Sequence, residues 1–86
     1  MMKKSGNNKV DMIVGRNIRI YRLGRALSQT EFGDKLEITF QTVQKIEKGT
    51  LSLKSEQLFR ISQILGVSLS MLFEGAQPED VQARSP

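Results

Sequence analysis

Residues 29–48 read QTEFGDKLEITFQTVQKIEK, and this stretch decides the fold. Apolar or small side chains recur in it with polar ones between them, at the spacing that gives a short helix one buried face. These positions are Phe32, Gly33, Leu36, Ile38, Val43 and Ile46. Gly33 lets a second helix approach closely, and Ile38 falls where the two helices join. The stretch therefore predicts two short helices, joined by a tight turn, that cross at roughly a right angle.

Residues that start and stop helices agree with this division. Ser28 followed by Glu31 forms a capping box, in which each side chain accepts a hydrogen bond from the other residue's backbone N–H. Thr39 can cap the second helix by accepting from an exposed N–H. Gly49 suits the left-handed conformation that ends a helix. We therefore expect one helix directly after Ser28 and the next over about residues 40–48.

Three further helices are expected at residues 11–23, 54–65 and 69–73. Asp11 is available to cap the first of them, and Gly24 to end it. The helix at 54–65 has an inward apolar face that Phe59 extends and that otherwise consists of Leu58, Ile61, Ile64 and Leu65. The sequence contains no strand pattern and no internal repeat. The expected fold class is all-α, with five helices.

Both ends of the chain have the composition of disordered segments. Residues 1–10 are polar and basic, and residues 76–86 contain two prolines and one isolated valine. We expect a disordered basic arm over 1–10, one domain over 11–75 and a disordered tail over 76–86. The arm has two interpretations, a solvated tail or a segment that follows the minor groove or the phosphates of DNA.

Composition limits the function. Eighty-six residues are the size of one small domain, which buries about 60% of its unfolded surface. The chain has no cysteine and no histidine, so it lacks disulfides, the usual general base and the commonest metal ligand. We expect no enzyme, no metal site and no cofactor. No stretch resembles a membrane span or a signal peptide, which predicts a cytoplasmic protein without a membrane partner.

The net charge is +4, and the acidic residues after residue 73 offset part of a more basic body. A basic domain favours a polyanionic partner, and basicity alone fits DNA, RNA or an acidic membrane. Four arginines recur every third residue along the first helix and just beyond it, at Arg16, Arg19, Arg22 and Arg25. Each step of three turns the side chain by about 60° on a helix, so the four do not form one stripe.

Three short motifs resemble those of the phage repressor and Cro class of regulators, also called the XRE family. They are Leu27-Ser28-Gln29, the run VQKIEKG at 43–49 and LGVS at 65–68. The resemblance covers residues 14–75. It implies a compact five-helix, repressor-like DNA-binding domain with its helix-turn-helix at the second and third helices. It further implies a transcriptional regulator, a repressor or controller, that binds double-stranded DNA as a homodimer on an inverted-repeat operator.

One position departs from the family pattern. The turn residue that is usually glycine in this family is Glu37. If Glu37 takes a positive φ, the steric cost is on the order of 1 kcal/mol. The alternative is a different turn, which would rotate the recognition helix at about 40–48.

The recognition helix has a predicted outward edge. Val43, Ile46 and Glu47 define its inward direction, and a rotation of 100° per residue places the opposite side chains outward. The candidates for base contacts in the major groove are Phe40, Gln41, Gln44 and Lys45. Gln41 can pair with adenine and Lys45 with guanine. Phe40 either meets a thymine methyl group or packs beside Ile38.

Other side chains are candidates for the DNA backbone. The resemblance assigns such a contact to Gln29, where a helix N-terminus also favours phosphate. The full set of backbone candidates is Gln29, Thr39, Thr42, Lys48, Lys54 and Ser55.

The resemblance also implies a partly buried ion pair between Arg22 and Glu47, which ties the first helix to the third. The candidates for a dimer interface are the apolar residues that the core needs least, namely Leu51, Leu53, Leu69 and Met71. The alternative for Leu69 is that it merely covers the end of the helix bundle.

A second class of function uses the same scaffold differently. The domain could be a protein-interaction module, such as an antitoxin or anti-activator partner, whose tail folds onto a target. The outward Gln41, Lys45 and Lys48 argue against it. RNA binding is weaker still, because Phe40 and Tyr21 are the only aromatic side chains available for a stacking platform.

Overall fold

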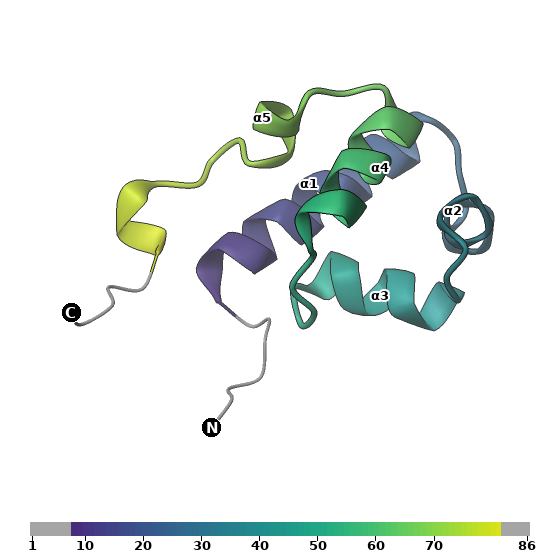
Figure 1. The fold of residues 1–86 in the computed structure, drawn as a ribbon, viewed down its shortest axis with the longest axis horizontal. Coiled ribbons are helices and arrows are strands. Elements are labelled where there is room, and N and C mark those ends of the chain that lie inside the picture. Colours follow the sequence, from purple (N-terminus) through teal and green to yellow (C-terminus); the bar gives the residue numbers. More distant parts are fainter. Residues whose placement is uncertain (1–7, 82–86) are drawn as a thin grey trace.

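The computed structural model describes residues 8–81, and within them the chain is all-helical (Figure 1). The helices are α1 Lys9–Gly24, α2 Gln29–Leu36, α3 Phe40–Lys48, α4 Ser55–Leu65 and α5 Leu69–Leu72, followed by a single 3-10 turn, η1 Pro78–Asp80. Figure 1 shows α2 nearly end-on beside the start of α3, with α1 and α4 crossing above α3. The all-α arrangement of five helices predicted from the sequence is confirmed over these residues.

Both ends of α1 differ from the prediction. The helix begins at Lys9, because the Asn8 side chain accepts from the Asp11 backbone N–H at 2.7 Å and so takes the capping role expected of Asp11. The helix also continues through Gly24. The left-handed residue after it is Ala26, at φ 58°, and not the glycine.

The ends of α2 and the start of α3 follow the sequence signals, while α4 begins and α5 ends one residue inside the predicted bounds. Ser28 Oγ accepts from the Glu31 N–H at 2.9 Å, and Glu31 Oε1 accepts from the Ser28 N–H at 2.8 Å, which completes the capping box. Thr39 Oγ1 accepts from the Thr42 N–H. Glu37 adopts φ 64° and ψ 40°, so the chain keeps the left-handed turn with glutamate in it, at a cost on the order of 1 kcal/mol.

One core unites the helices. Its fully or almost fully buried side chains are Val14, Ile18, Phe32, Leu36, Val43, Ile46, Ile61, Leu65 and Leu72. The expectation that Phe59 extends the inward face of α4 is wrong, because its side chain is 56% exposed. At 100° per residue, Phe59 lies about 160° around the helix from the buried Ile61 and therefore points to solvent.

Two glycines allow the helices to approach closely. A Cβ on Gly33 would lie 2.7 Å from the Ile38 carbonyl oxygen, as the sequence suggested for this position. The sequence pattern does not predict the second close approach, at Gly15. A Cβ there would collide with the Ile46 carbonyl oxygen and lie 2.9 Å from that of Glu47, so α1 rests directly on the backbone of α3.

Contacts also hold the segment after α5 against α1. Asn17 Nδ2 donates to the carbonyl oxygens of Leu72 at 2.8 Å and Glu74 at 2.9 Å. Beyond them, Lys9 Nζ lies 3.9 Å from Asp80 Oδ1. Residues 1–7 of the expected arm lie outside the described residues, as does the end of the tail, and the rest of the expected arm, 8–10, caps and begins α1. The described part of the tail, 76–81, contains η1.

Replacing Gly15 tests the contact between α1 and α3. Gly15→Ala should lower the free energy of unfolding by on the order of 1–3 kcal/mol, because its Cβ meets backbone that cannot move aside. Gly24→Ala is the matched control. Nothing lies within 4 Å of a Cβ at Gly24, so the same change should raise stability by about 0.5–1 kcal/mol. Urea unfolding measures both, and equal effects would contradict the close approach.

The capping box should make stability pH-dependent. The hydrogen bond from the Ser28 backbone, helped by that of its side chain, lowers the pKa of Glu31 below its usual value. The folded state therefore binds this proton less readily than the unfolded chain does. The contribution is present above the usual glutamate pKa and is lost as the pH falls through the lowered one. Measured at a series of pH values, the free energy of unfolding of Glu31→Gln should fall less steeply with decreasing pH than that of the wild-type protein. The same pH dependence in both proteins would contradict this contribution of Glu31.

Candidate nucleic-acid interface

Helix α3 has one buried face and one exposed face. Val43, Ile46 and Glu47 are buried, at 0%, 2% and 9% exposure. Gln41, Lys45 and Lys48 lie on the opposite side and are exposed, as the helical rotation predicts. Phe40, in the first turn of α3, is 43% exposed and thus lies outside the core. The outer side of α3 therefore presents an amide, two cations and an aromatic ring to solvent.

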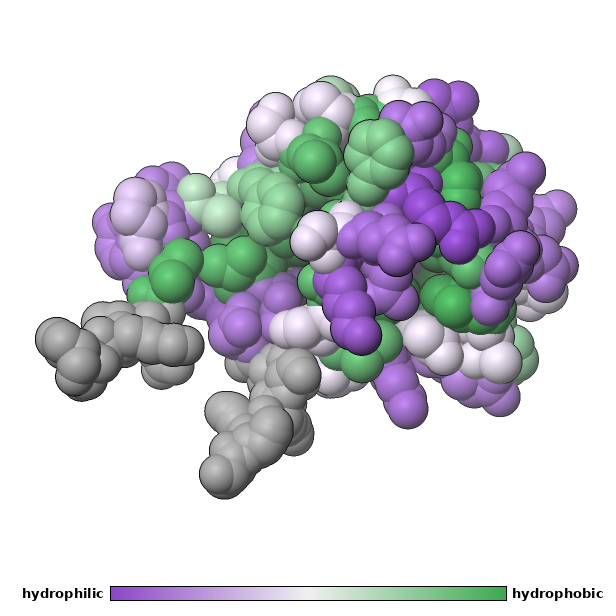
Figure 2. All heavy atoms as spheres, in the orientation of Figure 1, coloured by the Kyte–Doolittle hydropathy of each residue, from purple (hydrophilic) through white to green (hydrophobic). Residues whose placement is uncertain are grey.

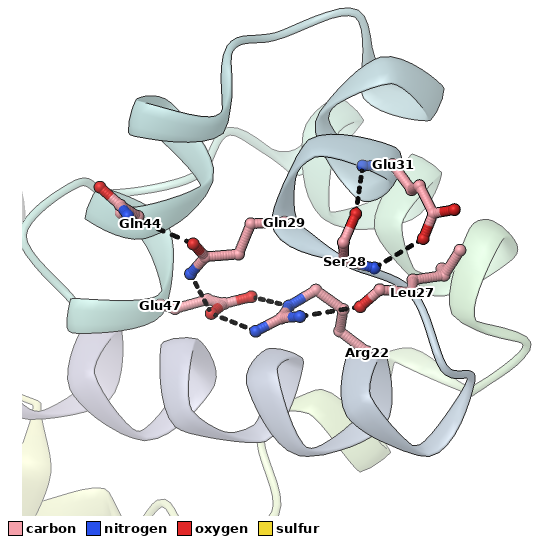
Figure 3. Close-up of polar contacts among 7 residues, drawn as sticks. All are labelled: Arg22, Leu27, Ser28, Gln29, Glu31, Gln44 and Glu47. Atoms are coloured by element: carbon pink, nitrogen blue, oxygen red, sulfur yellow. Dashed lines mark hydrogen bonds and ion pairs between the residues drawn. The ribbon is translucent and has the colours of Figure 1, made fainter.

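The orientation of α3 is set by a buried ion pair with α1 (Figure 3). Arg22 Nε donates to Glu47 Oε2 at 2.6 Å, and Arg22 Nη2 donates to Glu47 Oε1 at 3.1 Å. This bidentate ion pair has a fixed geometry. Both side chains are nearly inaccessible, at 6% and 3% exposure. Arg22 Nη1 also donates to the Leu27 carbonyl at 2.8 Å, which ties in the loop before α2. The pair thus joins α1, α3 and the entry to α2.

The carboxylate of Glu47 also orients two amides. A carboxylate only accepts, so the Gln29 atom that faces it must be nitrogen, and Gln29 Nε2 donates to Glu47 Oε1 at 3.1 Å. The Gln29 oxygen then accepts from Gln44 Nε2 at 3.3 Å. In Figure 3 the oxygen of Gln44 points away from Gln29. Gln44 is half-buried. Its bond to Gln29 fixes the orientation of its side-chain amide and leaves the carbonyl oxygen free to accept a hydrogen bond.

The candidates for contacts with the DNA backbone differ in how far their polar groups are already bonded within the protein. Gln29 uses its oxygen and one N–H within the network, which leaves its second N–H. The hydroxyls of Thr39 and Thr42 lie 3.0 Å apart and bond to each other. Lys54 and Ser55 are exposed at the start of α4, where the Lys54 N–H donates to Gln57 Oε1 at 3.0 Å.

The four dimer candidates separate into two pairs. Leu51 and Leu53 are half-buried and pack against the core, so they are less available than expected. Leu69 and Met71 on α5 are 44% and 38% exposed. Figure 2 shows apolar surface gathered around α5 and the neighbouring part of α1, while the α2 end of the molecule is richer in hydrophilic atoms.

One exposed residue beside α3 was not singled out from the sequence. Arg19 of α1 lines the same hollow as Gln29, Gln44, Glu47 and Lys48. Sequence spacing shows which way Arg19 points on its own helix, but the position of α3 beside it depends on the tertiary contact at Gly15. Within residues 8–81 there is no cluster of acidic side chains suited to a metal ion, and none of the helices there is long and apolar enough to cross a membrane.

This geometry agrees with the relationships of the chain. The model of the helix-turn-helix family matches residues 18–72, from the middle of α1 to the end of α5. The chain belongs to the helix-turn-helix family. The resemblance to the phage repressor and Cro class is thereby confirmed, and the domain is of the DNA-binding type found in transcriptional regulators.

Similar proteins share the fold in different settings. An uncharacterized HTH-type transcriptional regulator of Sinorhizobium medicae is 45% identical over 73 residues, which are 85% of this chain and 52% of that protein. The chain thus spans about half the length of this curated relative. The P22 c2 repressor, solved with a synthetic operator, has a TM-score of 0.67 and 22% identity over 73% of this chain and 96% of that one.

The fold is also part of a protein solved with a substrate. The cobalt form of HppE has a TM-score of 0.75 and 23% identity over 91% of this chain and 45% of that one. At these identities both structural likenesses show the fold alone.

Removing Arg22 tests the role of the ion pair. Arg22→Ala leaves the Glu47 carboxylate buried without its partner, which should cost about 3–5 kcal/mol of unfolding free energy. Arg22 lies behind α3, so the affinity for DNA per folded molecule should fall less than the stability does. Chemical unfolding and binding corrected for the folded fraction measure the two effects. A stable variant that has lost its affinity would contradict a structural role.

Proposed function

We propose that this domain is the DNA-reading part of a transcriptional regulator and acts in the cytoplasm, where it inserts α3 into the major groove. The observation that carries the proposal is the division of α3 into a buried aliphatic face and an exposed Gln41, Lys45 and Lys48 edge. The buried face holds the helix rigidly on the domain. The major groove is wide enough to admit an α-helix, whose exposed polar edge then faces the bases.

The charge supports a nucleic-acid partner. The chain carries +4, and the only acid on α3, Glu47, is neutralised by Arg22. Lys45 and Lys48 therefore face solvent without an acidic neighbour on their own helix. Such an edge attracts a polyanion and gives binding that weakens with salt.

We assign base contacts to Phe40, Gln41, Gln44 and Lys45. Gln41 can form two hydrogen bonds with the N6 and N7 atoms of adenine, and Lys45 can donate to O6 or N7 of guanine. Phe40 can touch the methyl group of thymine. Gln44 has its carbonyl oxygen free, because its nitrogen is held by Gln29. It should favour a base that offers an amino group in the groove, adenine or cytosine.

We assign the DNA backbone to Gln29, Thr39, Thr42, Lys48, Lys54 and Ser55. These residues lie at the starts of α2, α3 and α4 and at the end of α3. Helix starts aim unpaired N–H groups outward and favour phosphate, so such contacts set the position of the domain along the duplex.

We further propose that two copies bind an inverted repeat, which sets half-sites roughly 34 Å apart along the duplex. The exposed apolar Leu69 and Met71 on α5 support an interface there, with Leu51 and Leu53 contributing less because they pack on the core. The bound dimer would repress or control a nearby promoter.

Substitutions on α3 test base reading. Gln41→Ala or Lys45→Ala should each lose roughly 1–3 kcal/mol on the preferred site and relax the preference at one base position. Selection from random duplexes supplies that site, and a palindromic consensus would support the dimer. Lys35→Ala, on the exposed side of α2, is a control that should change little. Equal losses of Gln41→Ala on random and selected DNA would contradict base reading, and no binding at all would favour a protein-interaction module.

A further inference from the structure

A polar hollow opens between α1, α2 and α3. It has a volume of about 180 Å³ and is lined by Arg19, Gln29, Gln44, Glu47 and Lys48. Three helices therefore contribute to it, and it adjoins the exposed edge of α3. Glu47 lies at its base, because this side chain is almost fully buried.

The hollow carries a net positive charge. Glu47 is the only acidic residue that lines the hollow, and the bidentate ion pair with Arg22 neutralises its charge. Arg19 and Lys48 are exposed, and within residues 8–81 neither has an acidic partner within ion-pair distance. Two cations from different helices thus face a space in which the carboxylate charge is already balanced.

The amides of the hollow add donors. The bond from Gln29 Nε2 to Glu47 and the bond from Gln44 Nε2 to Gln29 each use one N–H of an amide that has two. Each amide nitrogen therefore keeps one N–H. Two cations and two oriented donors match an anion with several acceptor oxygens.

We propose that this hollow binds one phosphate of the DNA backbone, with Arg19 as a positioning residue from outside the helix-turn-helix. The proposal rests on the DNA binding proposed above and extends it to α1. Arg19 and Lys48 hold the phosphate from two helices, so the contact fixes the angle at which α3 enters the groove. It contributes equally on every base sequence, because phosphates carry no base information.

Salt dependence of binding to a labelled duplex of random sequence tests the site. One neutralised phosphate contributes about 0.9 to the log–log salt slope, so replacing both cations, Arg19→Gln together with Lys48→Gln, should make the slope shallower by about 0.9 and weaken binding about eightfold at about 0.1 M salt. Arg19→Gln alone and Lys48→Gln alone should each give a substantial part of that change. Arg19→Lys keeps the charge and should retain most of the slope. Urea unfolding should be unaffected, because Arg19 is exposed.

Arg16→Gln is the matched control, since Arg16 is an exposed arginine one turn earlier on α1 that does not line the hollow. It removes the same charge and should leave the slope nearly unchanged. Equal effects of Arg16→Gln and Arg19→Gln would overturn the site and leave DNA binding intact. A change of base preference in Arg19→Gln would also overturn it. A wild-type protein without any salt-dependent binding would instead overturn the proposed function.

Discussion

The buried pair of Arg22 and Glu47 is the constraint on which the rest of the structure depends. It joins α1 to α3 through two hydrogen bonds at 2.6 and 3.1 Å, in a place that water barely reaches. Such a pair adds little net stability compared with apolar residues, because both charges lose hydration. The pair instead fixes the relative position of the two helices, because any arrangement that separates Arg22 from Glu47 leaves a buried charge without a partner. With Gly15 pressed against the α3 backbone, it permits one orientation of α3.

The same carboxylate connects the core to the surface. Glu47 accepts from Arg22 on one side and from Gln29 on the other, and Gln29 accepts from Gln44. A group that can only accept therefore decides which atom each amide presents to solvent. The charge balance follows from the same contact, because Glu47 no longer offsets the cations of α3. One buried interaction therefore determines both the positive charge of the exposed edge of α3 and the orientation of the amides beside it.

Local patterns in the sequence predicted most of the fold. The capping box at Ser28, the stop at Gly49 and the apolar spacing of α2 and α3 each depend on residues within a few positions, so they can be recognised without coordinates. Two of the errors were local as well. Asn8, and not Asp11, caps α1, so the helix begins earlier than predicted and Asp11 lies in its first turn. Phe59 was assigned inward although its rotation from Ile61 places it in solvent. Gly15, Arg19 and the Gln29–Gln44 bond depend on how α1 meets α3, which spacing along one helix does not show.

The central claim is that the outer edge of α3, held by the pair beneath it, is the surface that meets DNA. Backbone amide NMR spectra of the protein, recorded during titration with a duplex, test it residue by residue. The largest shift changes should fall at the start of α2 and along Gln41, Gln44 and Lys45. Changes concentrated at Leu69 and Met71, with α3 unperturbed, would contradict the account.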